Sequence, residues 1–111
     1  MNVNPTIIAA LASLNLPVHA NSYNGTVAEY IVFNYADERP ALRADDTDIL
    51  DETTIQVHYY TRADPQTNKA AIRRLLRAAG FTIQSTQELF ENDTGYTHIV
   101  VYAWLEGAVN D

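Results

Sequence analysis

The sequence contains no cysteine, and this absence removes several kinds of chemistry at once. Disulfide bonds, thiolate nucleophiles, cysteine-ligated zinc and iron–sulfur clusters are all excluded. A chain without cysteine suits a protein of the cytosol or of an assembled particle. Basic residues are also scarce, because 7 Lys and Arg stand against 14 Asp and Glu, for a formal net charge of -7. That balance argues against independent binding to nucleic acid or to an anionic membrane surface.

Long apolar runs and the common catalytic motifs are missing as well. No apolar run is long enough to span a bilayer, and the first 14 residues lack a basic start, so they predict a helix and not a signal peptide. The chain has no GxGxxG, P-loop, GxSxG or HExxH motif. We therefore expect no catalytic residues, no cofactor and no metal ligands. The 111 residues, 47% of them hydrophobic, predict a single domain over 1–111 with its own core.

Residues 52–80 combine a strand with an amphipathic helix. Apolar and polar side chains alternate along residues 53–61, which predicts a strand with one buried face. The inward side chains are those of Ile55, Val57 and Tyr59, and the outward ones are those of Gln56, His58 and Tyr60. Residues 65–79 place apolar side chains at helical spacing, and Gly80 ends the helix. This pair should build most of the core.

The remaining elements add layers to this unit. We expect a helix from Asn4-Pro5 to about residue 15, and short strands over 18–23 and 29–35 joined by a hairpin at Asn24-Gly25. Strands over 81–88 and 97–105 should form a second hairpin, with the apolar 97–105 strand near the centre of the sheet. The order α-β-β-β-α-β-β predicts an α+β fold. Its single mixed or antiparallel sheet should carry two helices mostly on one face.

Charge is distributed unevenly along the chain. Residues 36–51 are polar and interrupted by proline, so they predict a long loop, and residues 37–52 hold seven acids and two bases. Lys69, Arg73 and Arg77 share one face of the second helix. Both features have a simple alternative as solvated surface. The sharper hypothesis is a head-to-tail contact between copies, with the acidic loop of one subunit on the basic helix of the next, which gives a ring if it closes.

The residues proposed for this subunit interface come from the loop, the helix and the outward face of the central strand. They are Asp45, Asp46, Asp48, Lys69, Arg73, Arg77 and Tyr60. The chain has seven tyrosines. Tyr60 is included because a tyrosine that points outward from a sheet can bury a large area in an interface at low entropic cost. Stacking on single-stranded nucleic acid is disfavoured, since the strands carry almost no Lys or Arg. His58 and His98 become neighbours if their strands pair, but as ordinary sheet residues in preference to metal ligands.

Several segments taken in order resemble a known family. They are NPTIIAALASLNLPV, YNGTVAEYIVFNYAD, the acidic stretch with ADD, TTIQVHYYTR, RRLLRAAGF and ELFENDTGYTHIVVYAW. This pattern resembles the small tail-completion proteins of long-tailed phages and prophages, also called tail terminator or tail-to-head joining proteins. The resemblance covers essentially the whole chain.

The resemblance implies a structural role and no enzyme activity. Such proteins form a ring, typically a hexamer, at the head-proximal end of the tail tube, where they stop tube polymerisation and join the head. The implied partners are further copies of the chain, the major tail tube protein and a head-completion or connector protein. DNA would pass through the lumen without specific binding. The implied location is the virion tail, assembled in the host cytoplasm, with no membrane involved. Two alternatives remain open: a head-completion or connector protein, and a small ferredoxin-like ligand-binding or regulatory domain.

Overall fold

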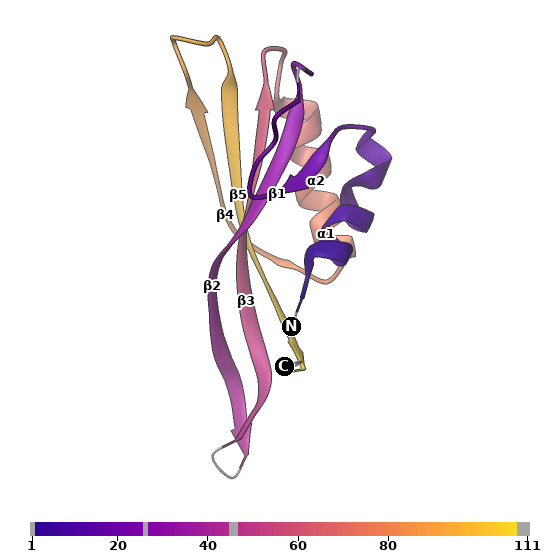
Figure 1. Ribbon diagram of the computed structural model, residues 1–111, viewed down its shortest axis with the longest axis vertical. Coiled ribbons are helices and arrows are strands. Elements are labelled where there is room, and N and C mark those ends of the chain that lie inside the picture. The colour runs from indigo at the N-terminus through magenta and orange to yellow at the C-terminus, as the bar shows by residue number, and fades with distance from the viewer. Residues whose placement is uncertain (1, 26, 45–46, 109–111) are drawn as a thin grey trace.

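Five strands form one sheet in the computed structural model, which describes residues 2–25, 27–44 and 47–108 (Figure 1). The strands are β1 (Val18–Ala20), β2 (Tyr30–Ala44), β3 (Thr47–Thr61), β4 (Thr82–Phe90) and β5 (Thr97–Ala108). Their order across the sheet is β1-β2-β3-β5-β4. β1 runs parallel to β2, and every other neighbouring pair is antiparallel. β5 therefore lies one strand in from the edge, as its apolar sequence indicates.

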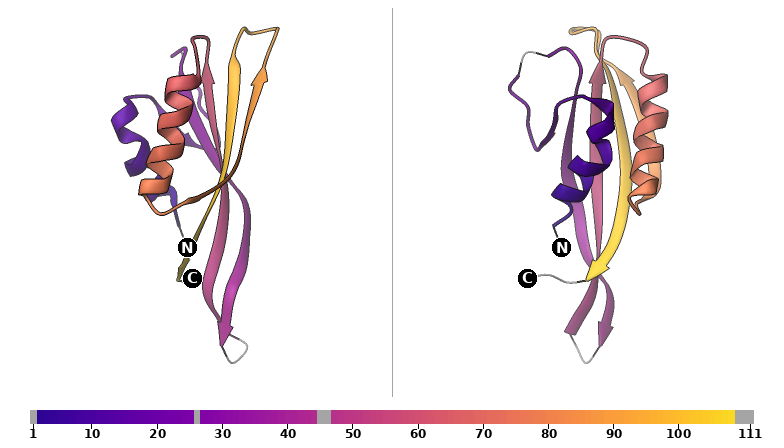
Figure 2. Two further views of the ribbon diagram at one scale, coloured as in Figure 1. Left: turned by 180° about the vertical axis from the view of Figure 1, so that it is seen from behind. Right: turned by 90° about the vertical axis from the view of Figure 1, so that its right-hand side faces the viewer.

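Both helices cover the same face of the sheet (Figure 2). α1 (Asn4–Leu11) continues into a 3-10 turn (Ala12–Leu14), and α2 (Gln66–Ala78) follows β3. The α+β fold with the order α-β-β-β-α-β-β is confirmed. Within the described residues, no helix combines the length and the apolar character that a membrane crossing requires.

The ends of α2 follow from local chemistry. The Asp64 carboxylate accepts a hydrogen bond from the Gln66 N–H at 3.0 Å, which satisfies a backbone donor of the first turn. At the other end Gly80 adopts φ +101°, a conformation that favours glycine, and its N–H donates to the Arg77 carbonyl at 3.0 Å. The sequence prediction of a helix over 65–79 is confirmed to within one residue at each end.

The core lies between the helices and the sheet, and the inward face predicted for β3 is confirmed. Ile55, Val57 and Tyr59 are fully buried. The Tyr59 hydroxyl donates a hydrogen bond to the Glu29 carboxylate and accepts one from Asn68 Nδ2 at 3.0 Å. This polar tip is satisfied, so a large aromatic ring can fill the centre of the core without an unpaired hydroxyl. The other buried members of this core are Val3, Ile7, Leu11, Ile31, Phe33, Ile72, Leu76, Phe81, Ile99, Val101 and Ala103.

Residues 36–44 and 47–51 form strands, so the prediction of a long loop is wrong. β2 and β3 continue together past the helices as a long hairpin, and we call residues 36–44 with 47–52 the β2–β3 arm (Figure 1). The register places Arg39 opposite Glu52, and the Arg39 guanidinium forms an ion pair with Asp37 on its own strand, with 2.7 Å between Nε and Oδ2. Pro40 lies at a register shift, where β2 has no outer neighbour among the described strands, so its missing N–H is tolerated.

The connection from β1 to β2 also differs from the prediction. The two strands are parallel, with Val18 beside Ile31, so Asn24-Gly25 does not lie in a hairpin. Asn21 adopts φ +68° directly after Ala20 and donates its N–H to the Phe33 carbonyl at 2.8 Å. The chain therefore leaves the sheet at residue 21, and the strand predicted over 18–23 is only three residues long.

Candidate assembly surfaces

A basic groove lies between α2 and β4. Its helix wall is formed by Lys69, Arg73 and Arg77, and its strand wall by residues 83–88, around a volume of about 370 Å³. We call it the α2–β4 groove. The helical spacing predicted a shared face for the three basic residues, and the structure confirms that all three line one groove. Lys69 Nζ pairs with Glu88 Oε1 at 3.3 Å. Within the described residues, neither Arg73 nor Arg77 forms an ion pair.

Two polar atoms in the walls of this groove are unsatisfied. Arg73 Nε and Thr86 Oγ1 are buried, and neither has a hydrogen-bond partner in the part of the chain that the structure describes. Unsatisfied buried groups typically cost about 1–3 kcal/mol each. A groove that keeps two of them beside unpaired guanidinium charge is suited to a polar, acidic occupant.

β4 is also an edge strand. It pairs with β5 on one side and ends the strand order, so its other backbone edge faces outward. An open edge is a template for a further strand. The register shift between Ile83 and Ser85 bends only its first part.

The described part of the acidic stretch predicted for the interface lies at the opposite end of the molecule from the α2–β4 groove. Asp48 belongs to β3 opposite Arg43 near the far end of the β2–β3 arm, whereas Asp45 and Asp46 lie outside the described residues. Figure 1 shows that this end of the arm points away from α2. The arm of one chain therefore does not reach the basic groove of the same chain. A contact between these two charged regions requires two molecules.

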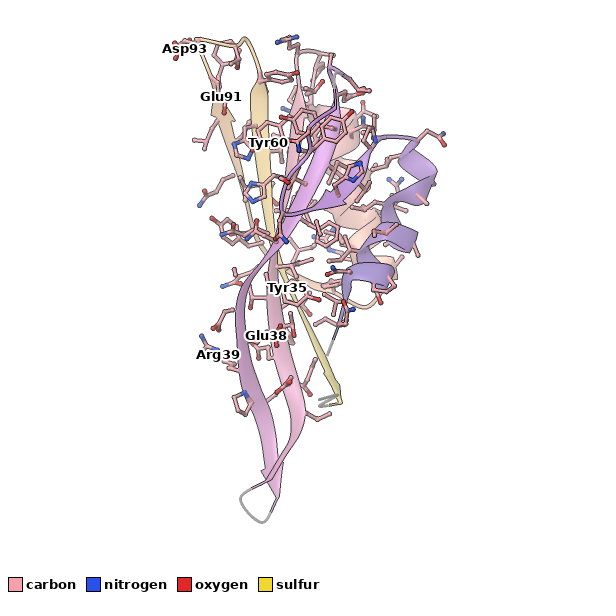
Figure 3. All side chains as sticks on the ribbon, in the orientation of Figure 1. Tyr35, Glu38, Arg39, Tyr60, Glu91 and Asp93 are labelled. Carbon is pink, nitrogen blue, oxygen red and sulfur yellow. The ribbon has the colours of Figure 1, made fainter. Side chains whose placement is uncertain are left out.

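Tyr60 lies on the other face of the sheet, away from the basic groove (Figure 3). Its ring stacks on Tyr30 at 4.8 Å and on His98 at 4.2 Å between ring centroids. The same row continues through Tyr23 to His19, at 4.8 and 5.1 Å. We call these five rings the aromatic row. Burial, and then the neighbouring Tyr30 and Glu91, raise the pKa of Tyr60, so its ring stays neutral at physiological pH.

A chain of hydrogen bonds runs beside the aromatic row. His58 Nε2 lies 2.8 Å from Asn34 Oδ1, and His58 Nδ1 lies 2.8 Å from His98 Nε2. If His58 donates to the Asn34 oxygen, its Nδ1 must accept from His98, which leaves His98 Nδ1 facing Glu91 Oε2 at 3.9 Å. The expectation that the two histidines meet when their strands pair is confirmed. Among the described residues, no group of three or more His, Cys, Asp or Glu could hold a metal ion.

This histidine pair should make stability fall on mild acidification. Burial lowers the pKa of both imidazoles below about 6.5; the charge of His98 lowers that of His58 further, and Glu91 partly opposes the shift at His98. The unfolded chain therefore takes up protons at higher pH than the folded chain. The contribution of the neutral histidine pair to the free energy of unfolding is complete above about pH 6.5. It declines as the pH falls towards the lowered pKa values, by at most about 1.4 kcal/mol per pH unit for each proton.

Urea unfolding at several pH values between about 7.5 and 5.5 measures this slope, which is the change in the free energy of unfolding per pH unit. The double variant His58→Gln with His98→Gln should lose most of it. His19→Gln is the matched control, because it removes an imidazole outside the hydrogen-bonded pair and leaves that pair intact. A wild-type protein that gains stability on acidification in this range would contradict the interpretation.

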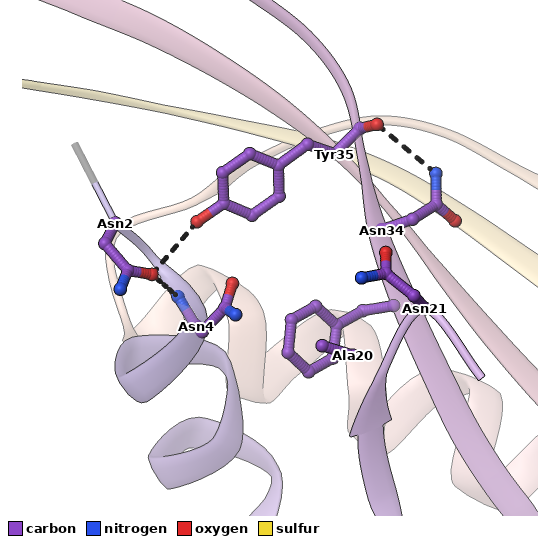
Figure 4. Close-up of a pocket in the computed structure, with 7 residues that line it drawn as sticks. Asn2, Asn4, Ala20, Asn21, Asn34 and Tyr35 are labelled. Atoms are coloured by element: carbon purple, nitrogen blue, oxygen red, sulfur yellow. Dashed lines mark hydrogen bonds between the residues drawn. The ribbon is translucent and has the colours of Figure 1, made fainter. Parts of the chain in front are cut away.

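A further hollow, of about 400 Å³, lies where the start of α1 meets β1 and β2 (Figure 4). The Tyr35 hydroxyl donates to Asn2 Oδ1 at 3.2 Å and accepts from the Val3 N–H at 2.7 Å. These bonds tie the N-terminal segment to β2. Among the described residues, the side chains that line the hollow are all uncharged.

Sequence reasoning found one wall of the basic groove and missed the other. Thr86 and Glu88 on β4 face α2 because of the strand register, which no local pattern reveals. The aromatic row was missed for the same reason, since its rings come from β1, the following loop, β2, β3 and β5. The only local signal was the frequency of tyrosine on predicted strands.

No family model matches the chain, and no curated protein sequence matches it. Its fold does match a solved structure, that of a chain in the "virion of native gene transfer agent (GTA) particle". The match has a TM-score of 0.61 and covers 90% of this chain and 84% of that one. The two chains are 16% identical, so the likeness establishes a shared fold.

Proposed function

We propose that this protein is a structural component of a phage-like virion, and more specifically a tail-completion subunit. The observation that carries the proposal is the likeness to a chain of a gene transfer agent virion, which extends over 90% of the present chain. The sequence resemblance to tail-completion proteins points the same way and supplies the finer role. The protein would act by assembly and not as an enzyme.

In this role, copies of the chain form a ring, of six subunits in line with the resemblance, at the head-proximal end of the tail tube. The ring stops tube growth and joins the tail to the head. Its further partners are the major tail tube protein and a head-completion or connector protein. The protein is assembled in the host cytoplasm and ends in the virion tail.

Two physical features support a ring. The β2–β3 arm and the α2–β4 groove lie at different ends of the molecule, so a contact between them is heterologous and can close into a ring. The formal net charge of -7 also suits a lumen through which DNA passes without sticking, because like charges repel. The interface residues proposed from sequence divide accordingly. Asp48 belongs to the donor arm, Lys69, Arg73 and Arg77 belong to the acceptor groove, and Tyr60 belongs to a separate surface. Asp45 and Asp46 lie outside the described residues and remain interface predictions from the sequence.

Tube polymerisation with the tail tube protein from the same particle tests the proposed role. Purified chain added to growing tubes should cap one end and shorten the length distribution. A variant that fails to self-assemble should leave tube length unchanged. Tubes that grow to the same length with and without the wild-type chain, and that carry no cap in electron micrographs, would contradict the tail-completion role.

A further inference from the structure

We propose that the α2–β4 groove is the receptor for the β2–β3 arm of a second copy of this chain. This inference rests on the proposed ring and specifies the contact that would build it. The arm and the groove then form one repeated interface, in which every subunit donates an arm to one neighbour and accepts an arm from the other.

Charge complementarity selects the occupant of the groove. Residues 37–52 carry seven acids and two bases, whereas the helix wall of the groove carries Lys69, Arg73 and Arg77. Glu88 neutralises Lys69 only, at 3.3 Å, so the guanidinium charges of Arg73 and Arg77 are available to an incoming carboxylate. Two copies related by a twofold axis through this groove would oppose like charges, which disfavours that arrangement.

Backbone geometry also fits a strand from a second copy. β2 has a neighbour on its outer side only where β1 pairs with residues 31–33, so its part in the arm has an open edge among the described strands. β2 and β4 run in opposite directions, because three antiparallel pairings separate them. A second copy in the same orientation, displaced along the strands until its arm lies beside β4, would therefore bring its β2 antiparallel to β4, which is the commoner kind of strand pairing.

The lengths of the two elements agree. Residues 36–44 of the arm and the nine residues of β4 each span about 30 Å at about 3.3 Å per residue. An arm that lies along β4 can therefore occupy the full length of the groove and contact both Arg73 and Arg77. Arg73 Nε and Thr86 Oγ1, which are unsatisfied in the single chain, lie in the walls that such an arm would cover.

Cross-linking tests this contact directly, because the chain has no cysteine of its own. Glu38→Cys places a thiol on the exposed arm, and Gln84→Cys places one in the strand wall of the groove. The two single variants are mixed and treated with a short bismaleimide. The control mixture pairs Glu38→Cys with Ala9→Cys, an exposed position on α1. Electron micrographs of the untreated mixtures record rings.

The expected result is a cross-linked dimer from the first mixture and none from the control, with the dimer lost at high salt because screening weakens the contact. Rings without this dimer would overturn the arm–groove contact and leave the ring proposal standing. The dimer without rings would support the contact and count against the ring. If neither forms, in the protein alone or with tail tubes added, both fail. Binding of short duplex DNA that needs Arg73 and Arg77, with no dimer, would assign the groove to nucleic acid and overturn the inference.

Discussion

Arg73→Glu combined with Arg77→Glu is expected to abolish self-assembly of the protein. Both side chains line the α2–β4 groove, and neither forms an ion pair within the described residues of its own chain. Reversal sets carboxylates against an acidic arm, and like charges in an interface cost several kcal/mol. A loss of about 3 kcal/mol per contact weakens association by roughly 100-fold. Native mass spectrometry and light scattering over a range of salt concentrations measure the effect.

Arg74→Glu is the matched control for this variant. Arg74 has the same charge on the same helix, but it is exposed and does not line the groove. Its reversal should leave the oligomer intact. Arg77→Glu alone separates assembly from folding, because Arg77 is exposed whereas Arg73 is partly buried. An oligomer whose mass and salt sensitivity are unchanged by the double reversal would rule out the groove as the subunit contact.

Phe33→Ala should cause the largest loss of stability. Phe33 is fully buried in the middle of the sheet, and replacement of a buried phenylalanine by alanine typically costs about 3–5 kcal/mol. Domains of this size have a free energy of unfolding of about 5–15 kcal/mol, so the variant should retain little stability. Urea unfolding followed by the fluorescence of the single tryptophan, Trp104, gives the value.

Phe90→Ala provides the control with the same chemical change. Phe90 ends β4 and is 64% exposed, so its loss should change the free energy of unfolding by no more than about 0.5 kcal/mol. Equal losses at Phe33 and Phe90 would contradict the position assigned to the core.

Local periodicity was sufficient to predict the body of the fold. Alternation along residues 53–61 fixed the buried face of β3, and helical spacing with Gly80 fixed α2, because both signals lie within one element. The β2–β3 arm was missed because its strand pairing is not a local signal. Arg39 lies opposite Glu52 only after the hairpin closes, so the stretch looks like a polar loop when it is considered alone.

The candidate surfaces show the same limit. The basic face of α2 was predictable from spacing, but its position beside the open edge of β4 depends on sheet order. The pairing of His58 with His98 depended on the register of β3 against β5, and was therefore a conditional prediction. The parallel β1 could not be predicted, because Asn24-Gly25 resembles a hairpin turn and its effect is overridden by the left-handed Asn21.

Electron microscopy of the purified protein, combined with native mass spectrometry at high protein concentration, shows whether the chain forms a ring. We expect closed rings with a central opening and a mass six times the 12.4 kDa of the chain, for the protein alone or bound to tail tubes. A protein that remains monomeric alone and with tail tubes, and never forms a closed ring, would contradict the proposed ring.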